Sequence, residues 1–326
     1  MIYIHNREVR GSRMNWDERI GRRLKLRDLH VFLSVVQAGS MAKASTRLAV
    51  SQPAVSKAIS EMEYALGVPL LDRGPRGVEP TRFGQALLKR SVAVFDELKQ
   101  GVQEIEFLSD PTVGEVTIGS PEPLSAGLAT AVIDRLSSRY PLITFQVVQA
   151  DPATLLRYLD ERKVEIVLAR MLDRSVEKHM SVDILYDDPV VVVAGPENQW
   201  ARRRKIALAD LVNERWVLYP PDTLLGEAVA KAFRSSGLEP PRSSVITLSL
   251  SMRASLLATG HFLSMLPGSA LQFSAKHAAI RALPIDLPAT RQPVGLVTLK
   301  HRALSPVGRL FIECVHEIIR PLVRAR

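Results

Sequence analysis

The side chains with the most readable chemistry in this 326-residue chain recur within one short segment. At about 100° per residue they fall on one side of a helix, and they are Gln52, Pro53, Ser56, Lys57 and Ser60. Glutamine can bond the edge of adenine twice, serine bonds a base or a phosphate, proline offers apolar surface to a thymine methyl, and lysine meets guanine or phosphate. This set of side chains is suited to reading base edges in DNA.

The same segment carries the signals of a bounded helix. Ser51 suits the N-cap, Pro53 falls in the first turn, and Gly67 suits the C-cap. The opposite stripe is apolar and predicts a packed face, formed by Val55, Ile59, Met62 and Leu66. Taken alone, the polar stripe is better explained by an ordinary solvated helix face. The neighbouring sequence favours the DNA-reading interpretation.

Two shorter apolar patterns precede this helix and a turn follows it. The helix expected at 41–49 offers Met41, Ala44 and Leu48 for packing, and the one before it offers Leu26, Leu29, Leu33 and Val36. After Gly67 the sequence VPLLDRGPRGVEPTRFG places a glycine and proline turn between short apolar runs. Arg73, Arg76 and Arg82 surround that turn, within reach of phosphates beside a groove. Residues 24–82 therefore predict a winged helix-turn-helix.

The run from Leu24 to Leu108 resembles the N-terminal region of LysR-type transcriptional regulators. The resemblance rests on SQPAVSKAISEMEYALGVPLLDR and on TRFGQALL, which opens a long helix. It implies that the helix beginning SQPAVS enters the major groove, with base contacts from Gln52, Pro53, Ser56 and Lys57. It also implies that Ser51 and Arg73 contact the DNA backbone. The expected function is sequence-specific transcriptional regulation.

A long helix is expected after the wing, with its linker and dimerisation part at 83–110. No proline interrupts 81–108, and apolar residues follow a heptad spacing that Ser91 breaks: Leu88, Phe95, Leu98, Val102 and Ile105. Such a seam can pack on its own domain. Following a DNA-binding unit, pairing between two chains is favoured, because a twofold protein places two reading helices on a pseudo-palindromic operator. The family resemblance implies the same role, in a homodimer or homotetramer.

The remaining residues, 111–326, alternate strand-like and helix-like runs. VTIGS, TFQVVQA and VEIVLAR read as strands with helices between them, and RWVLYP, SVITLS and FLSMLPGSAL form a second set. DPVVVVAG and QPVGLVTLK read as strands passing between the sets. We therefore expect an α/β region of two parallel-sheet subdomains, 111–187 with 292–326, and 188–291. It resembles the periplasmic-binding-protein-like effector-binding half of LysR-type regulators.

Ligands of open α/β sheets gather beyond the carboxyl ends of the strands. The residues expected there are Ser120, Pro121, Glu122, Asp151, Arg170, Tyr219, Thr223 and Ser251. The alternative for each is a residue that only turns the chain, and Arg170 has the further alternative of an ion pair with Asp151 or Glu122. The stretch GVQEIEFLSDPTVGEVTIGSPEPLSAGL is similar to galactose-binding-protein regulators, which implies a sugar effector, although Arg170 also suits a carboxylate.

Other classes of protein find less support. The histidines lack metal-ligand spacing, and the sequence contains no phosphate-binding glycine loop or nucleophile elbow, so we predict no catalytic residue, metal or cofactor. The remaining alternative is a non-catalytic small-molecule binding protein without transcriptional coupling. The net charge of +9 favours an anionic partner weakly. RNA polymerase is a further expected partner.

Three features concern the setting of the chain. The one cysteine, Cys314, allows no internal disulfide and suits a reducing cytoplasm. The sequence contains no apolar run long enough to predict a membrane span. Residues 1–23 are charged and aperiodic, and we expect them to be disordered or an artefactual extension, with Met14 as an alternative start.

Overall fold

The computed structural model describes residues 24–75, 77–170, 177–273 and 280–324. The expectations for residues 1–23 and for Arg76 lie outside this range. The chain forms two compact units, Met1–Leu98 and Lys99–Arg326, each described here by itself. Within the described residues, no helix has both the length and the apolar character needed to cross a membrane.

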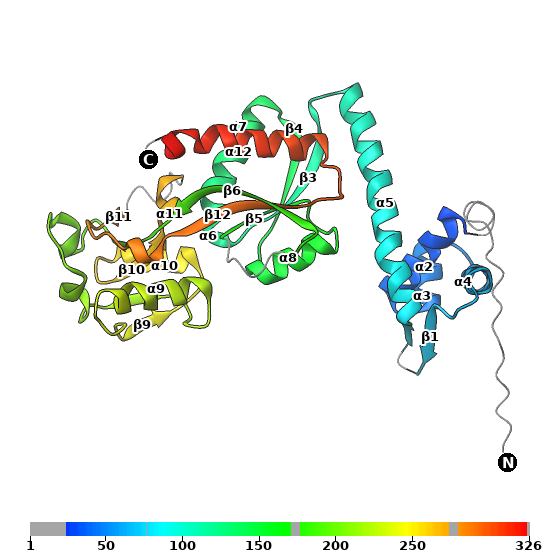
Figure 1. Ribbon diagram of the computed structural model, residues 1–326, viewed down its shortest axis with the longest axis horizontal. Helices are drawn as coiled ribbons and strands as arrows, with labels where there is room; N and C mark the ends of the chain where they lie inside the picture. The colour runs from blue at the N-terminus through cyan, green and yellow to red at the C-terminus, as the bar shows by residue number, and fades with distance from the viewer. Residues whose placement is uncertain (1–23, 76, 171–176, 274–279, 325–326) are drawn as a thin grey trace, which may run out of the picture. The chain divides into compact units, whose positions relative to one another are not determined.

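The first unit is a winged helix-turn-helix (Figure 1). Its elements are α2 (Leu26–Ala38), α3 (Met41–Leu48), α4 (Gln52–Leu66), and the antiparallel strands β1 (Leu71–Gly74) and β2 (Gly77–Pro80). The core is fully buried at its centre and joins all three helices through Phe32, Val35, Ala44, Val55, Ile59 and Met62. One packing prediction was wrong: Leu26, the first residue of α2, is 50% exposed, whereas Leu29 in the same turn is 8% exposed and packs in the core.

The predicted helix ends are confirmed. Ser51 has extended backbone and its hydroxyl accepts a hydrogen bond from Ala54 N, while Pro53 lies in the first turn of α4. Gly67 ends α4 with φ 70°, in the left-handed region that favours glycine. Ala49 adopts the same region with φ 52° in the tight turn between α3 and α4, so this turn carries a strained non-glycine residue.

Helix α5 (Arg82–Ser109) is a single 28-residue helix, as predicted. Its heptad positions separate into two groups. Leu88 and Phe95 are half-buried against the helix-turn-helix core, where the Phe95 ring lies 5.7 Å from that of His30. Leu98, Val102 and Ile105 are 48%, 55% and 67% exposed. The first part of the seam thus packs on its own unit, which was one of the two predicted alternatives, and the later part stays open.

The second unit contains two five-stranded sheets. The first sheet has the order β4-β3-β5-β12-β6, from β3 (Val113–Gly119), β4 (Leu142–Val148), β5 (Ile166–Arg170), β6 (Met180–Asp188) and β12 (Gln292–Leu299). The second has the order β11-β7-β10-β8-β9, from β7 (Val190–Ala194), β8 (Trp216–Leu218), β9 (Ser243–Ile246), β10 (Leu263–Pro267) and β11 (Arg281–Ala282). We call them subdomain I and subdomain II, each with its covering helices.

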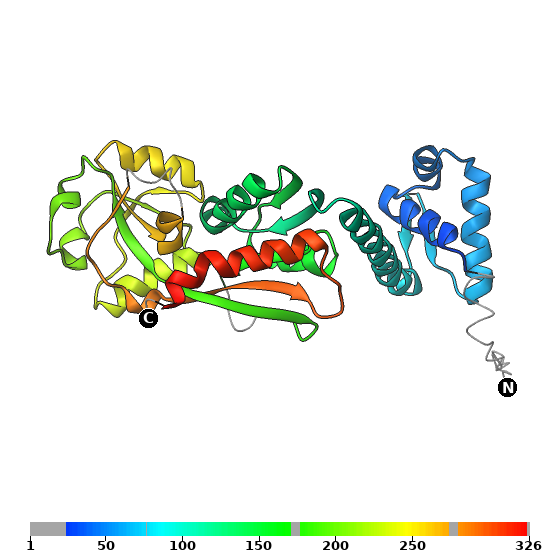
Figure 2. The ribbon, with the colours of Figure 1, turned by 90° about the horizontal axis from the view of Figure 1, so that it is seen from above.

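Helices cover both faces of the first sheet. They are α6 (Glu122–Leu124), the π-helix η1 (Ser125–Ala129), α7 (Thr130–Arg139), α8 (Pro152–Asp160) and α12 (Pro306–Arg324). Figures 1 and 2 show α7 and α12 together on one face and α8 on the other. The strand alternation agrees, because Ile166 and Leu168 pack in the cluster with α7 and α12, whereas Val167 and Ala169 pack with α8.

Subdomain II has its own apolar core around Trp216 and Phe233, whose rings meet edge to face at 5.6 Å. Its helices are α9 (Leu224–Ser235), α10 (Leu250–Ala258) and α11 (Gly268–Gln272), with short helical turns η2 (Gln199–Arg202), η3 (Leu208–Leu211) and η5 (Pro288–Thr290).

The sheets are mixed, which corrects the expectation of parallel sheets. The predicted βαβαβ set is parallel, with β3 pairing in parallel with both β4 and β5. The strands that connect the subdomains run against their neighbours: β12 is antiparallel to β5 and β6, and β7 to β10. Strands β7 and β12 each enter their sheet directly from the other subdomain. A parallel pairing would require a helical crossover within the same subdomain, which these two strands do not have, so they pair antiparallel.

Candidate DNA-binding face and effector site

The polar side of α4 is presented to solvent. Gln52, Pro53 and Lys57 are exposed and Ser56 is half-buried, so the structure brings the predicted base-reading side chains together on one face. This face extends further than the sequence prediction. Glu61 forms an exposed ion pair of 3.8 Å with Lys57, and Tyr64 is 85% exposed. Their spacing of four and seven residues from Lys57 was the signal for them.

Hydrogen bonds fix α4 relative to the wing. The Glu63 carboxylate near the end of α4 accepts hydrogen bonds from the backbone N–H groups of Leu70 and Leu71, at 2.8 and 3.2 Å. The wing is tied to α5 in turn, because the Thr81 hydroxyl donates to the Pro69 carbonyl and accepts from Gly84 N. The reading helix and the wing therefore belong to one rigid unit.

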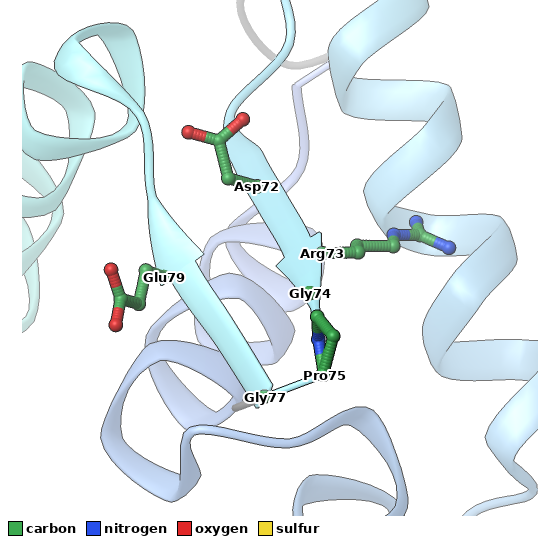
Figure 3. A pocket seen from close by; sticks show the side chains of 6 residues that line it. All are labelled: Asp72, Arg73, Gly74, Pro75, Gly77 and Glu79. Atoms are coloured by element: carbon green, nitrogen blue, oxygen red, sulfur yellow. The ribbon is translucent and has the colours of Figure 1, made fainter.

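The two faces of the wing differ in charge. Asp72 lies directly opposite Glu79 in the hairpin, and Arg73 lies opposite Val78. Neighbouring residues of a strand point to opposite faces, so Arg73 is separated from both carboxylates. Figure 3 shows Arg73 extending away from the side that holds Asp72 and Glu79. Arg82 is exposed at the start of α5, with its guanidinium 4.6 Å from the centre of the Phe83 ring.

In subdomain I, the predicted effector residues differ in burial and in their local contacts. Ser120 is completely buried and bonded through its backbone to Val148 and to the Ser125 hydroxyl. Pro121 precedes α6 and Glu122 begins it. Asp151 is the exposed N-cap of α8, and its hydrogen bonds with Thr154 hold the pKa of its carboxyl below the ordinary value. Asp151 thus has a local structural role as the N-cap of α8.

Arg170 forms a buried ion pair, but with neither partner that the sequence suggested. Its Nη2 lies 2.6 Å from Asp188 Oδ2, and Nη1 donates to the Asp188 carbonyl oxygen. The same carboxylate accepts from the backbone N–H and the hydroxyl of Ser269 in α11. Asp188 ends β6, where the chain leaves subdomain I. One buried carboxylate therefore connects the two subdomains at the crossover.

The predicted residues of subdomain II are Tyr219, Thr223 and Ser251. Tyr219 is 5% exposed, and its burial raises the pKa of its phenol. Thr223 caps α9 by accepting a hydrogen bond from Gly226 N. Ser251 is exposed in the first turn of α10, with its hydroxyl 3.0 Å from that of Ser249.

Sequence reasoning missed Arg253, which has no exposed surface. Its guanidinium donates to the carbonyl oxygens of Val217 and Thr247 and to the Ser264 hydroxyl, and lies 3.9 Å from the centre of the Tyr219 ring. Burial lowers the pKa of this guanidinium. Its position on the stripe of buried residues shared with Leu250 and Leu257 was the available signal.

A second missed feature joins the subdomains near Arg253. Glu122 Oε2, from subdomain I, accepts a hydrogen bond of 3.2 Å from Leu250 N, the first residue of α10 in subdomain II. Glu122 also acts electrostatically on both Tyr219 and Arg253. The predicted residues Glu122, Tyr219 and Ser251 therefore gather around the start of α10, together with Arg253.

Two family models match nearly all of the described chain. Residues 26–85 match the bacterial regulatory helix-turn-helix protein, lysR family, and residues 109–320 match the LysR substrate binding domain. The transcriptional dual regulator GltC of Bacillus subtilis is 25% identical over 299 residues, covering 92% of this chain and 99% of the relative. The regulator GbpR of Azospirillum brasilense is 26% identical over 288 residues, covering 88% and 84%.

Solved structures agree on the fold. A full-length single-residue variant of OxyR from Pseudomonas aeruginosa has a TM-score of 0.63 at 19% identity, covering 91% of this chain and 95% of that one. Full-length CbnR in complex with its target DNA has a TM-score of 0.52 at 21% identity, covering 91% and 100%. The two family models together match most of the chain. They establish that the chain belongs to the LysR family of DNA-binding transcriptional regulators, which join a helix-turn-helix domain to an effector-binding domain.

Proposed function

We propose that the chain binds a pseudo-palindromic operator as a homodimer or homotetramer and reads it with the exposed face of α4. Base contacts come from Gln52, Pro53, Ser56 and Lys57. Backbone contacts come from Ser51, Arg73, Arg76 and Arg82. The observation that carries this proposal is the capped, exposed polar face of α4, held to the wing through Glu63.

The open part of the α5 seam supports pairing through the linker. Leu98, Val102 and Ile105 expose apolar surface on the last turns of a long helix, and pairing two such seams removes that surface from water. Leu88 and Phe95 extend the same stripe, although both also pack on their own unit.

The effector site that we propose lies where the two subdomains meet. It includes Glu122, Tyr219 and Ser251 at the start of α10, and Ser120, Pro121, Asp151, Arg170 and Thr223 around them. The side chains offer hydroxyl and carboxylate groups, so a sugar-like effector with several hydroxyls fits their chemistry. Since the site is built from both subdomains, a ligand there favours one relative placement of the two, and the linker carries the difference to the DNA.

The protein acts by binding alone and performs no chemistry on its effector. It works in the cytoplasm, where bacterial operator DNA lies, and RNA polymerase is its partner in transcription.

The test compares specific with non-specific DNA. Gln52→Ala and Ser56→Ala are expected to lower affinity for the operator by about 1 to 3 kcal/mol each, because each removes a base contact. Affinity for unrelated DNA should change little, since phosphate contacts remain. Ser138→Ala, on α7 outside the DNA-binding unit, is the matched control. Equal losses of affinity on both DNAs would contradict the assignment of α4 as the base reader.

A further inference from the structure

The start of α10 already holds an anion, and that anion belongs to the chain itself. Glu122 Oε2 accepts the hydrogen bond of Leu250 N, whose position 128 residues away lies in the other subdomain. Helix N-termini favour negative groups because their first N–H groups are unpaired within the helix and the helix dipole is positive there. In α10, a nine-residue helix, Ser249 satisfies Met252 N, and Glu122 satisfies Leu250 N.

Arg253 adds positive charge directly beside this helix terminus. The side chain is fully buried, and within the described residues its hydrogen-bond partners are all neutral groups, on Val217, Thr247 and Ser264. Its Nε, also buried, has no hydrogen-bond partner in that part of the chain. A buried cation that lacks a carboxylate partner is costly unless negative charge is supplied nearby. Glu122, which its hydrogen bond with Leu250 N holds at the start of the same helix, is a negative group from the other subdomain that acts electrostatically on Arg253.

Arg170 differs from Arg253 in this respect. Its charge is paired directly with the Asp188 carboxylate, which also accepts hydrogen bonds from Ser269, although the buried Nε of Arg170, like that of Arg253, has no hydrogen-bond partner among the described residues. The position that a ligand can take over is therefore the one held by Glu122, a half-buried side chain with a single hydrogen bond in the described structure.

We propose that the effector carries an oxyanion, a carboxylate or a phosphate, which replaces the Glu122 carboxylate at the first turn of α10. This inference rests on the proposed function, because it names the chemical class of the effector of the same site. Together with the hydroxyl groups around the site, the proposed oxyanion makes a polyhydroxylated acid or a sugar phosphate the expected effector. Replacement breaks the hydrogen bond between Glu122 and Leu250, so the anion acts on a contact that joins the two subdomains.

The test uses three probes with one sugar framework: galactose, galacturonate and galactose 6-phosphate. Calorimetry on the full chain compares the unmodified protein with Glu122→Gln, which removes the competing charge and keeps the shape. Glu239→Gln makes the same change at an exposed site between α9 and β9, and is the matched control. We expect at least one anionic probe to bind Glu122→Gln about tenfold or more tighter than the unmodified protein. Galactose affinity should stay unchanged, and Glu239→Gln should behave as the unmodified protein.

Which anion gains affinity separates a carboxylate from a phosphate effector. The proposal is overturned if neither anion binds Glu122→Gln more tightly, or if this variant loses galactose binding, which would make Glu122 a direct contact for a neutral sugar. Melting temperature confirms that the variant is folded. Hydrogen exchange of the peptide containing Leu250 adds an independent readout, with faster exchange expected in Glu122→Gln without ligand.

Operator binding by the same samples separates this inference from the proposed function. A protein that gains anion affinity but shifts no promoter DNA would refute the regulator and leave the anion site standing. One that shifts promoter DNA without the gain in anion affinity would refute the anion site alone.

Discussion

The open seam of α5 gives the sharpest test of assembly, through Leu98→Glu. Leu98 is 48% exposed, so roughly half of its side chain is available for burial against a second chain. Complete burial of a leucine contributes about 1.5 to 3 kcal/mol, which leaves about 1 kcal/mol per protomer. In a twofold interface the residue occurs twice, so its loss costs about 2 kcal/mol, or roughly 30-fold in the dimer dissociation constant. A charge buried in the seam adds to this.

Sedimentation equilibrium over a range of concentrations measures the dimer dissociation constant. Affinity for a two-half-site operator should fall in parallel with dimerisation. The unfolding free energy of the monomer should change by less than about 0.5 kcal/mol, because Leu98 is half exposed there. Glu97→Gln, the preceding exposed residue, is the control. Phe95 is unsuitable for this test because it also packs on the helix-turn-helix core. An unchanged mass distribution for Leu98→Glu would exclude the linker as the dimer contact.

Two further predictions concern the wing and one helix cap. Arg73→Ala should weaken binding to all DNA sequences and reduce the slope of log affinity against log salt by about one, as expected for one lost phosphate contact; an unchanged slope in fluorescence titrations argues against that contact. Asp151→Ala should lower the free energy of unfolding by about 0.5 to 2 kcal/mol at neutral pH, because Asp151 caps α8. The folded-state pKa of Asp151 lies below its ordinary value of 3.8, so this stabilisation is present above that pH and is lost as the pH falls through the folded value. Urea unfolding of both proteins at neutral and acidic pH should show the difference narrowing, and a constant difference would exclude a charged cap.

Local patterns were enough to define the DNA-binding unit. The ends of α4 follow from Ser51, Pro53 and Gly67, whose effects act within one helical turn. The apolar stripe Val55, Ile59 and Met62 is buried as its period predicts. The predicted wing strands and the long uninterrupted α5 are likewise confirmed. In each case the signal lies between residues close in sequence.

Tertiary structure decided what happens where distant segments meet. A heptad pattern does not distinguish packing on the same chain from packing on another, and only the fold places Leu88 and Phe95 on their own core. The partner of Arg170 depends on where β6 ends, and the contact of Glu122 spans 128 residues. Arg253 shares a stripe of α10 with Leu250 and Leu257, but the burial of an arginine on that stripe depends on the sheet against which α10 packs. Sequence periodicity determines which face of an element is buried, whereas charge pairing depends on three-dimensional proximity that no local spacing encodes.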